Sequence, residues 1–228
     1  MSSTAQALTL DGHGVVYYRE QEVPDAVSAH LIKRFSLSLD LESVVSIYNA
    51  LQEEAFSHEI TYREMLHRLC EALGPRLNGK ESYVDSLIQR YSAAIVLDPD
   101  LKSLLSELRR RGVVVGMITN SINPAGTKLT WLESNGVAEL FDIIVSSVDE
   151  GCQKPDPEIY WRFVRKTGIP PARTVFVGHD VKEVEGAKGA GMITVCLRCN
   201  SPEADYVVTK LGDVIGLSIW PKEKEVDG

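Results

Sequence analysis

Two hydrophobic patterns alternate along much of the chain. Short, continuously apolar runs are typical of strands buried on both faces of a parallel sheet. Between these runs, apolar residues recur every three or four positions, as they do on one face of a helix. Strands that alternate with helices predict an α/β fold, a doubly wound and mostly parallel sheet with right-handed crossovers. The predicted strands lie within residues 5–16 and at 113–118, 143–145, 174–177, 193–197 and 206–208.

One long segment departs from this alternation. From residue 26 to about residue 96, the apolar positions have helical spacing and no strand is indicated. A stretch of this length is within the usual size range of a domain. We therefore predict an α/β core formed by residues 1–18 and 97–228, with an all-helical cap domain, residues 19–96, inserted between its two parts.

Composition and charge narrow the class of protein. The chain has 228 residues, 44% hydrophobic and 25% charged, which is typical of a soluble globular protein with a substantial core. Its formal net charge of −8 argues against nucleic acid as a partner, because nucleic-acid modules normally present a basic face. No apolar stretch of ~18 residues and no secretory signal are visible, so we expect no membrane partner and a cytoplasmic location.

The four cysteines indicate no obvious site. Cys196 and Cys199 have the spacing of zinc ligands, but Cys70 and Cys152 are isolated and complete no four-ligand set. In a reducing compartment we expect buried or strand-end thiols at these positions.

Polar side chains stand where four of the predicted strands end. The first of these is an aspartate between an apolar run and a turn in which Gly12 and Gly14 permit positive φ angles. Because parallel strands end at one edge of a sheet, these polar groups are expected to converge there. They are Asp11, Thr119 with Asn120, Lys154, and the group His179, Asp180 and Glu183.

The order and chemical types of these four clusters resemble the motifs of the haloacid dehalogenase-like hydrolase superfamily, a group of aspartate-nucleophile phosphatases and their relatives. The resemblance extends over nearly the whole chain, including the helical cap between the first and second motifs. It implies that Asp11 is the nucleophile, that Thr119 hydrogen-bonds the transferred phosphoryl group with Asn120 beside it, and that Lys154 supplies positive charge. An anionic nucleophile that attacks an anionic phosphate needs such neutralisation.

Two histidines depart from the family pattern. His13 stands where the family has the aspartate that protonates the leaving group, and we expect it to take over acid/base duty because imidazole titrates near neutrality. His179 replaces the first acid of the fourth motif, Glu183 matches the second, and Asp180 is one place out of register. The resemblance implies Mg²⁺ held by Asp11, the backbone oxygen of His13 and these three side chains. Imidazole is a poorer ligand for Mg²⁺ than carboxylate, so Mn²⁺ or no metal are alternatives.

Three functions are compatible with these residues. The first is a phosphoric monoester phosphatase that acts on a small phosphorylated metabolite, as a monomer or a homodimer. The second is a catalytically impaired relative that keeps the fold for binding, since a fold alone does not guarantee chemistry. The third is a metal-independent hydrolase of carbon–halogen bonds, which also uses an aspartate nucleophile.

Overall fold

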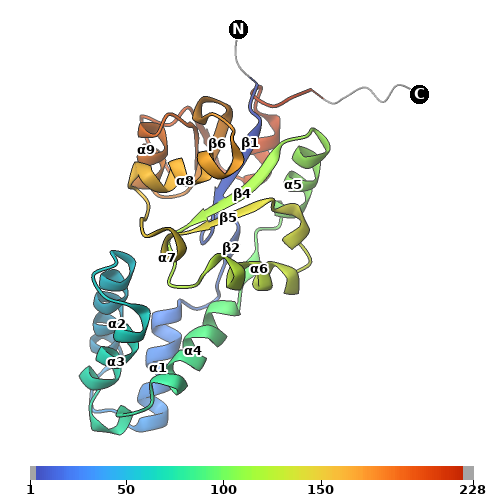
Figure 1. Ribbon diagram of the computed structural model, residues 1–228. Coiled ribbons are helices and arrows are strands. Elements are labelled where there is room, and N and C mark those ends of the chain that lie inside the picture. Colours follow the sequence, from blue (N-terminus) through green and yellow to red (C-terminus); the bar gives the residue numbers. More distant parts are fainter. Residues whose placement is uncertain (1–3, 223–228) are drawn as a thin grey trace. The chain divides into compact units, whose positions relative to one another are not determined.

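The structure, a computed structural model, describes residues 4–222, and the chain divides into two compact units (Figure 1). Of these residues, 4–18 and 97–222 form the core unit, and Arg19–Val96 form the helical unit. Two short strands, β2 (Tyr17–Tyr18) and β3 (Val96–Leu97), lie in the segments that connect the units and pair with each other.

A six-stranded parallel sheet forms the centre of the core unit. Its strand order is β5-β4-β1-β6-β7-β8, and each neighbouring pair runs parallel. β1 lies in the middle because the chain adds β4 and β5 on one side and then returns to add β6, β7 and β8 on the other. The predicted doubly wound α/β fold is confirmed. The strands are β1 (Ala7–Asp11), β4 (Val114–Thr119), β5 (Ile143–Ser146), β6 (Thr174–Gly178), β7 (Ile193–Leu197) and β8 (Tyr206–Val208).

Helices cover both faces of this sheet, and Figure 1 shows α8 and α9 on one side and α5 on the other. The ring of Tyr160 in α8 meets that of Phe176 in β6 edge to face, with centroids 5.3 Å apart, and both side chains are fully buried. Such aromatic contacts add to the stabilisation from apolar burial. The helical elements are α5 (Leu101–Arg110), α6 (Ala125–Ser134), η2 (Ala138–Leu140), α7 (Ser147–Glu150), α8 (Pro157–Thr167), η3 (Pro171–Arg173), α9 (Val181–Gly189) and η4 (Leu211–Gly216).

The start of α8 is fixed by its own sequence. The side chain of Asp156 caps the helix by accepting a hydrogen bond from the backbone N–H of Glu158, and Pro157 occupies the first turn. At the other end Gly168 has a φ of 69°, in the left-handed conformation that commonly ends helices. This capped helix anchors the loop that carries Lys154.

The helical unit consists of α1 (Val23–Phe35), α2 (Leu41–Phe56), α3 (Tyr62–Ala72), η1 (Pro75–Leu77) and α4 (Glu81–Ala93). α1 packs against α2 and α4, and α3 packs against α2 and α4. Leu31, Tyr48, Met65, Leu69 and Ile88 are fully buried and form much of its core. Within residues 4–222, none of the helices combines the length and apolarity needed to cross a membrane.

The cysteines differ from the expectation of free thiols. Cys196 and Cys199 form a disulfide at the end of β7. Their Cα atoms are 5.4 Å apart, within the range that a disulfide can bridge, because the chain turns sharply at Arg198, whose φ is 58°. Cys70 and Cys152 are free, as expected.

Candidate active site

The predicted site residues of the core unit lie at the carboxyl edge of the sheet. Asp11 is the last residue of β1, Thr119 is the last residue of β4, and His179 directly follows β6. β1 pairs with both of the other strands, so these three residues lie side by side in the sheet. The chain reverses its direction of sheet growth at this point, which is where open α/β sheets bind ligands.

A tight turn follows Asp11. The N–H of Val16 donates to the carbonyl groups of Asp11 (3.2 Å) and Gly12 (2.9 Å), and the N–H of Gly14 donates to the carbonyl of Tyr17 (2.8 Å). A Cβ atom on Gly12 would lie 2.8 Å from Oγ1 of Thr119, so only glycine allows the turn to approach β4 this closely. We call residues 11–17 the nucleophile turn, after the role that the sequence predicts for Asp11.

The carboxylate of Asp11 is buried and held on both of its oxygens. Oδ1 accepts hydrogen bonds from the backbone N–H of Gly12 (2.7 Å) and from Nζ of Lys154, and Oδ2 lies 3.1 Å from Nδ1 of His179. Burial alone would raise the pKa of Asp11, but the charge of Lys154 and the hydrogen bonds from Lys154 and His179 lower it overall. Asp11 is therefore an ionised carboxylate at neutral pH, in the state that a nucleophile requires.

Lys154 lies in the loop between α7 and α8, not at the end of a strand as the sequence predicts, and brings its ammonium group to two carboxylates. Nζ donates to Asp11 and, at 2.7 Å, to Oε2 of Glu183, and the side chain is 1% exposed. Burial by itself would lower the pKa of Lys154, yet the two carboxylates raise it, so the group stays charged. Asn120 fixes the backbone beneath it: its Nδ2 donates to the carbonyl of Lys154 (2.9 Å), and its Oδ1 accepts from the N–H of Lys154 (2.8 Å).

The polar residues of α9 have different partners from one another. Asp180 caps the helix, and its Oδ1 accepts from the N–H groups of Lys182 (2.8 Å) and Glu183 (3.2 Å). Glu183 lies one turn further on and reaches Lys154. Burial raises the pKa of Glu183. The charge of Lys154 opposes this rise only in part, because its ammonium group is shared with the carboxylate of Asp11.

The ring of His179 fills the space beside the nucleophile turn. Gly14 has a φ of 86°, and a Cβ atom on it would lie 2.5 Å from Cε1 of the His179 ring. The hydrogen bond to Asp11 raises the pKa of His179, although partial burial opposes this shift. The imidazole therefore tends to be protonated, and its positive charge then lies directly against the carboxylate.

The expected metal ligands are not arranged around a common ion position, although Asp11, His179 and Glu183 lie near one another. Among residues 4–222, no group of three or more His, Cys, Asp or Glu side chains is arranged to hold a metal ion. The side chain of His179 is directed to Asp11, Asp180 caps α9, and Glu183 binds an ammonium group. Asp11 and the backbone oxygen of His13 are the remaining candidates, and both oxygens of Asp11 already have partners within the chain. Magnesium needs several oxygen ligands in near-octahedral geometry, and this arrangement does not fit that ion.

His13 lies on the nucleophile turn, where its backbone forms a bridge with Tyr17 and its ring centroid is 6.1 Å from that of Tyr17. Tyr17 also contacts a lysine that is not among the predicted site residues. Lys128 in α6 is 3% exposed, donates from Nζ to the Tyr17 hydroxyl (2.9 Å), and lies 4.4 Å from the ring centroid of Trp131. Tyr17, the last residue of the nucleophile turn, is the sequence feature closest to this cluster.

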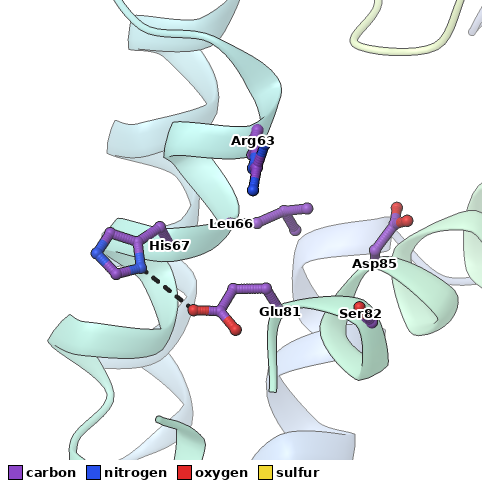
Figure 2. A pocket seen from close by; sticks show the side chains of 6 residues that line it. All are labelled: Arg63, Leu66, His67, Glu81, Ser82 and Asp85. Carbon is purple, nitrogen blue, oxygen red and sulfur yellow. Dashed lines mark hydrogen bonds and ion pairs between the residues drawn. The ribbon is translucent and has the colours of Figure 1, made fainter. Parts of the chain in front are cut away.

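The helical unit contains a separate pocket of about 550 Å³ between α3 and α4. Figure 2 shows Arg63, His67, Glu81 and Asp85 around it, with a hydrogen bond between His67 and Glu81 of 3.2 Å. The remaining lining residues are Leu66 and Ser82. None of these residues is among the predicted site residues, and their charges of both signs are mostly solvated, so we assign the chemistry to the carboxyl edge of the sheet.

Comparison with known proteins identifies the family to which the chain is similar. The family model described as haloacid dehalogenase-like hydrolase matches residues 6–191. A sesquiterpene phosphatase from Aspergillus oryzae is 29% identical over 194 residues, which span 85% of this chain and 90% of that protein. A glyceraldehyde 3-phosphate phosphatase from Methanopyrus kandleri is 34% identical over 101 residues, 44% of this chain and 42% of that protein. A phosphoglycolate phosphatase from Escherichia coli is 28% identical over 123 residues, 54% of this chain and 48% of that protein.

The chain thus spans about half the length of two of these relatives. Among solved structures, a 2-haloacid dehalogenase from Pseudomonas syringae superposes with a TM-score of 0.73 at 19% identity, covering 93% of this chain and 97% of that one. At this level of identity the likeness shows the fold. The predicted family resemblance is confirmed by the family match.

Proposed function

The chain belongs to the haloacid dehalogenase-like hydrolase family, and we propose that it is a phosphoric monoester hydrolase that transfers a phosphoryl group to Asp11. The observation that carries the proposal is the buried contact between the carboxylate of Asp11 and the ammonium group of Lys154 at the carboxyl edge of the sheet. The pair joins a nucleophile to a positive charge that can balance a phosphoryl group. The phosphatases among the relatives support the same reaction class.

In the first step, an oxygen of Asp11 forms a bond to phosphorus while the bond from phosphorus to the leaving oxygen breaks. Lys154 balances the charge of the transferred group, and the hydroxyl of Thr119, 2% exposed at the end of β4, is in place to donate to a phosphoryl oxygen. Asn120 keeps Lys154 in position through its two backbone hydrogen bonds. In the second step, water attacks phosphorus, and inorganic phosphate leaves as the carboxylate of Asp11 is restored.

The leaving oxygen needs a proton, and we propose that His13 supplies it. His13 is two residues after Asp11 on the nucleophile turn, and its side chain is partly exposed. Imidazole donates and accepts protons near neutral pH, which is the property that a general acid requires. The glycines on either side of His13 let the turn pack closely against Thr119 and the ring of His179.

The positive charge in this site comes from the chain itself. Lys154 contacts one oxygen of Asp11, and His179, whose pKa is raised by its hydrogen bond to Asp11, contacts the other. In relatives that bind Mg²⁺ the ion would contribute charge neutralisation, but the donors here do not form such a site. We propose, from the resemblance alone, that Arg19–Val96 acts as a cap that selects the substrate, and that the substrate is a small phosphorylated metabolite.

One observation favours a second candidate, a hydrolase of carbon–halogen bonds. The Asp11 carboxylate is held by Lys154 and His179 without a cluster of metal ligands among the described residues, which suits an aspartate nucleophile that works without a metal. In that reaction the aspartate displaces a halide to form an ester, and water then hydrolyses the ester.

The two candidates are separated by their products. We expect purified protein to release phosphate from p-nitrophenyl phosphate or from members of a panel of sugar phosphates and phosphoglycolate. We expect no halide release from 2-chloropropionate, and Asp11→Asn should abolish the phosphate release. Assays with Mg²⁺, Mn²⁺ and EDTA measure the metal requirement. Halide release would favour the second candidate, and absence of both products would favour a binding protein.

A further inference from the structure

An arginine at the end of β7 is held in a conformation that is rare for residues other than glycine. Arg198 has a φ of 58°, in the left-handed region, and the Cys196–Cys199 disulfide closes the turn that contains it. Non-glycine residues in this conformation carry a steric cost and occur where surrounding structure imposes it, often at functional sites. The contacts of the Arg198 side chain therefore indicate the role of this turn.

The guanidinium group of Arg198 reaches the nucleophile turn. Its Nη2 donates to the carbonyl of Gly14 at 3.0 Å and also to the hydroxyl of Tyr18, and its Nη1 lies 3.5 Å from Oδ2 of Asp98. The guanidinium carbon also lies 5.3 Å from the ring centroid of Tyr18. A planar group with five N–H donors can hold several acceptors in one fixed geometry.

Tyr18 and Asp98 are themselves joined. The Tyr18 hydroxyl donates to Oδ2 of Asp98 at 3.1 Å, and the side chain of Asp98 is only 4% exposed. Burial, with the nearby carboxylate of Asp98, raises the pKa of Tyr18 to about 12 in spite of Arg198, so its hydroxyl keeps the proton that it donates. Tyr18 ends the segment that leaves the core unit, and Asp98 lies in the segment that returns to it.

Gly14 links these contacts to the reacting groups. It is three residues from Asp11, and its Cα packs against the ring of His179, which in turn lies 3.1 Å from Asp11. Because there is no space for a Cβ atom at Gly14, a displacement of this residue also displaces His179 or opens a gap beside it.

We propose that Arg198 is a positioning residue that fixes the nucleophile turn and ties it to the two connecting segments, so that Asp11 is held in the geometry required for attack. The catalytic part rests on the proposed function. The structural part, that Arg198 restrains residues 12–18, rests on the contacts alone. Arg198 acts through Gly14 and Tyr18 rather than by touching the phosphoryl group.

The test compares Arg198→Gln and Arg198→Lys with Arg109→Gln. Arg109 is a matched control, because its side chain is 35% exposed against 41% for Arg198, and it likewise donates to a carboxylate (Asp142) and a backbone carbonyl (Leu140). The first readout is amide hydrogen exchange of peptides that contain residues 12–18, measured by mass spectrometry. The second is kcat and KM for p-nitrophenyl phosphate.

We expect exchange over residues 12–18 to accelerate about 10-fold in Arg198→Gln, and kcat to fall about 10- to 100-fold with KM changed less than about 3-fold, since small displacements of a nucleophile reduce the chemical step most. Arg198→Lys should lie between this variant and the wild type, because an ammonium group lacks the planar fork. Arg109→Gln should match the wild type in both readouts.

Exchange over residues 12–18 that is the same in Arg198→Gln and Arg109→Gln would overturn the proposal. Wild-type exchange and kcat in Arg198→Lys would overturn it as well, because the fork would then be dispensable. The exchange readout needs no turnover. Faster exchange in a protein that hydrolyses no phosphate ester would therefore support the restraint by Arg198 while the proposed function fails.

Discussion

Removal of the ammonium group of Lys154, which Asp11 and Glu183 share, should strongly destabilise the core unit. Its side chain is 1% exposed and faces Asp11, 7% exposed, and Glu183, 17% exposed. The substitution Lys154→Met keeps most of the apolar stem but removes the charge. Two carboxylates then remain close together with only His179 to compensate them, and a buried charge that loses its partner costs about 3–5 kcal/mol.

Protonation of one carboxylate limits this cost. A glutamic acid with an ordinary pKa of about 4.3 lies about 2.7 units below pH 7, and at about 1.4 kcal/mol per unit its protonation costs about 3.7 kcal/mol. At pH 5 the same step costs only about 1 kcal/mol. The folded-state pKa of Glu183 is already raised by burial, and loss of the Lys154 charge raises it further above the unfolded value, so the added penalty is absent at low pH and grows as the pH rises. We expect a loss of about 3–4 kcal/mol at pH 7 and about 1 kcal/mol at pH 5.

Urea unfolding at both pH values measures this loss. The three tryptophans, Trp131, Trp161 and Trp220, all belong to the core unit, so their fluorescence follows the unit that contains the site. Lys188→Met is the control, because Lys188 pairs with Asp205 at the surface, with side chains 38% and 33% exposed, and such pairs contribute about 0–1 kcal/mol. A loss for Lys154→Met that is below about 1 kcal/mol at pH 7, or the same at both pH values, would refute the buried three-group arrangement.

Three further predictions concern other parts of the core unit. The double substitution His13→Asp with His179→Asp restores the family pattern of acids and should raise Mg²⁺-dependent hydrolysis of p-nitrophenyl phosphate at least ~10-fold; unchanged activity would mean that the histidines do not limit the site. Gly12→Ala places a Cβ atom 2.8 Å from Oγ1 of Thr119, so kcat should fall at least ~10-fold, and wild-type kinetics would contradict the close approach. The pKa of Asp205 is lowered by hydrogen bonds from a lysine and a threonine, which outweigh burial. Its contribution to stability should therefore be present above about pH 4 and lost as the pH falls through the lowered folded-state pKa; melting temperatures of Asp205→Asn and wild type that differ equally at pH 7 and at pH 3 would contradict this.

The sheet could be predicted because its strands are continuous apolar runs. The run that ends at Thr119 was placed within one residue of β4, and residues 193–197 coincide with β7. All but the first residue of each strand are buried, and such an environment favours apolar side chains at most positions. The four-residue α7 (Ser147–Glu150) was missed because a single turn is too short to show helical spacing.

The residues at the strand ends could be predicted, but their partners could not. Sequence spacing placed Glu183 and Asp180 near the nucleophile, yet it could not show that one binds Lys154 and the other caps α9. That choice depends on how α9 is oriented after β6, which is set by tertiary packing. Likewise, the sharp turn at Arg198 brings Cys196 and Cys199 within disulfide distance, and no local sequence signal predicts a left-handed arginine.

The central claim, that Asp11 is the nucleophile, is tested most directly by trapping the intermediate. The protein is mixed with ³²P-labelled p-nitrophenyl phosphate, quenched in acid within a single turnover, digested and mapped by mass spectrometry. We predict label on the peptide that contains Asp11, lost on treatment with hydroxylamine as expected of an acyl phosphate, and no label in Asp11→Asn. Turnover without label on this peptide, or turnover retained in Asp11→Asn, would contradict the account.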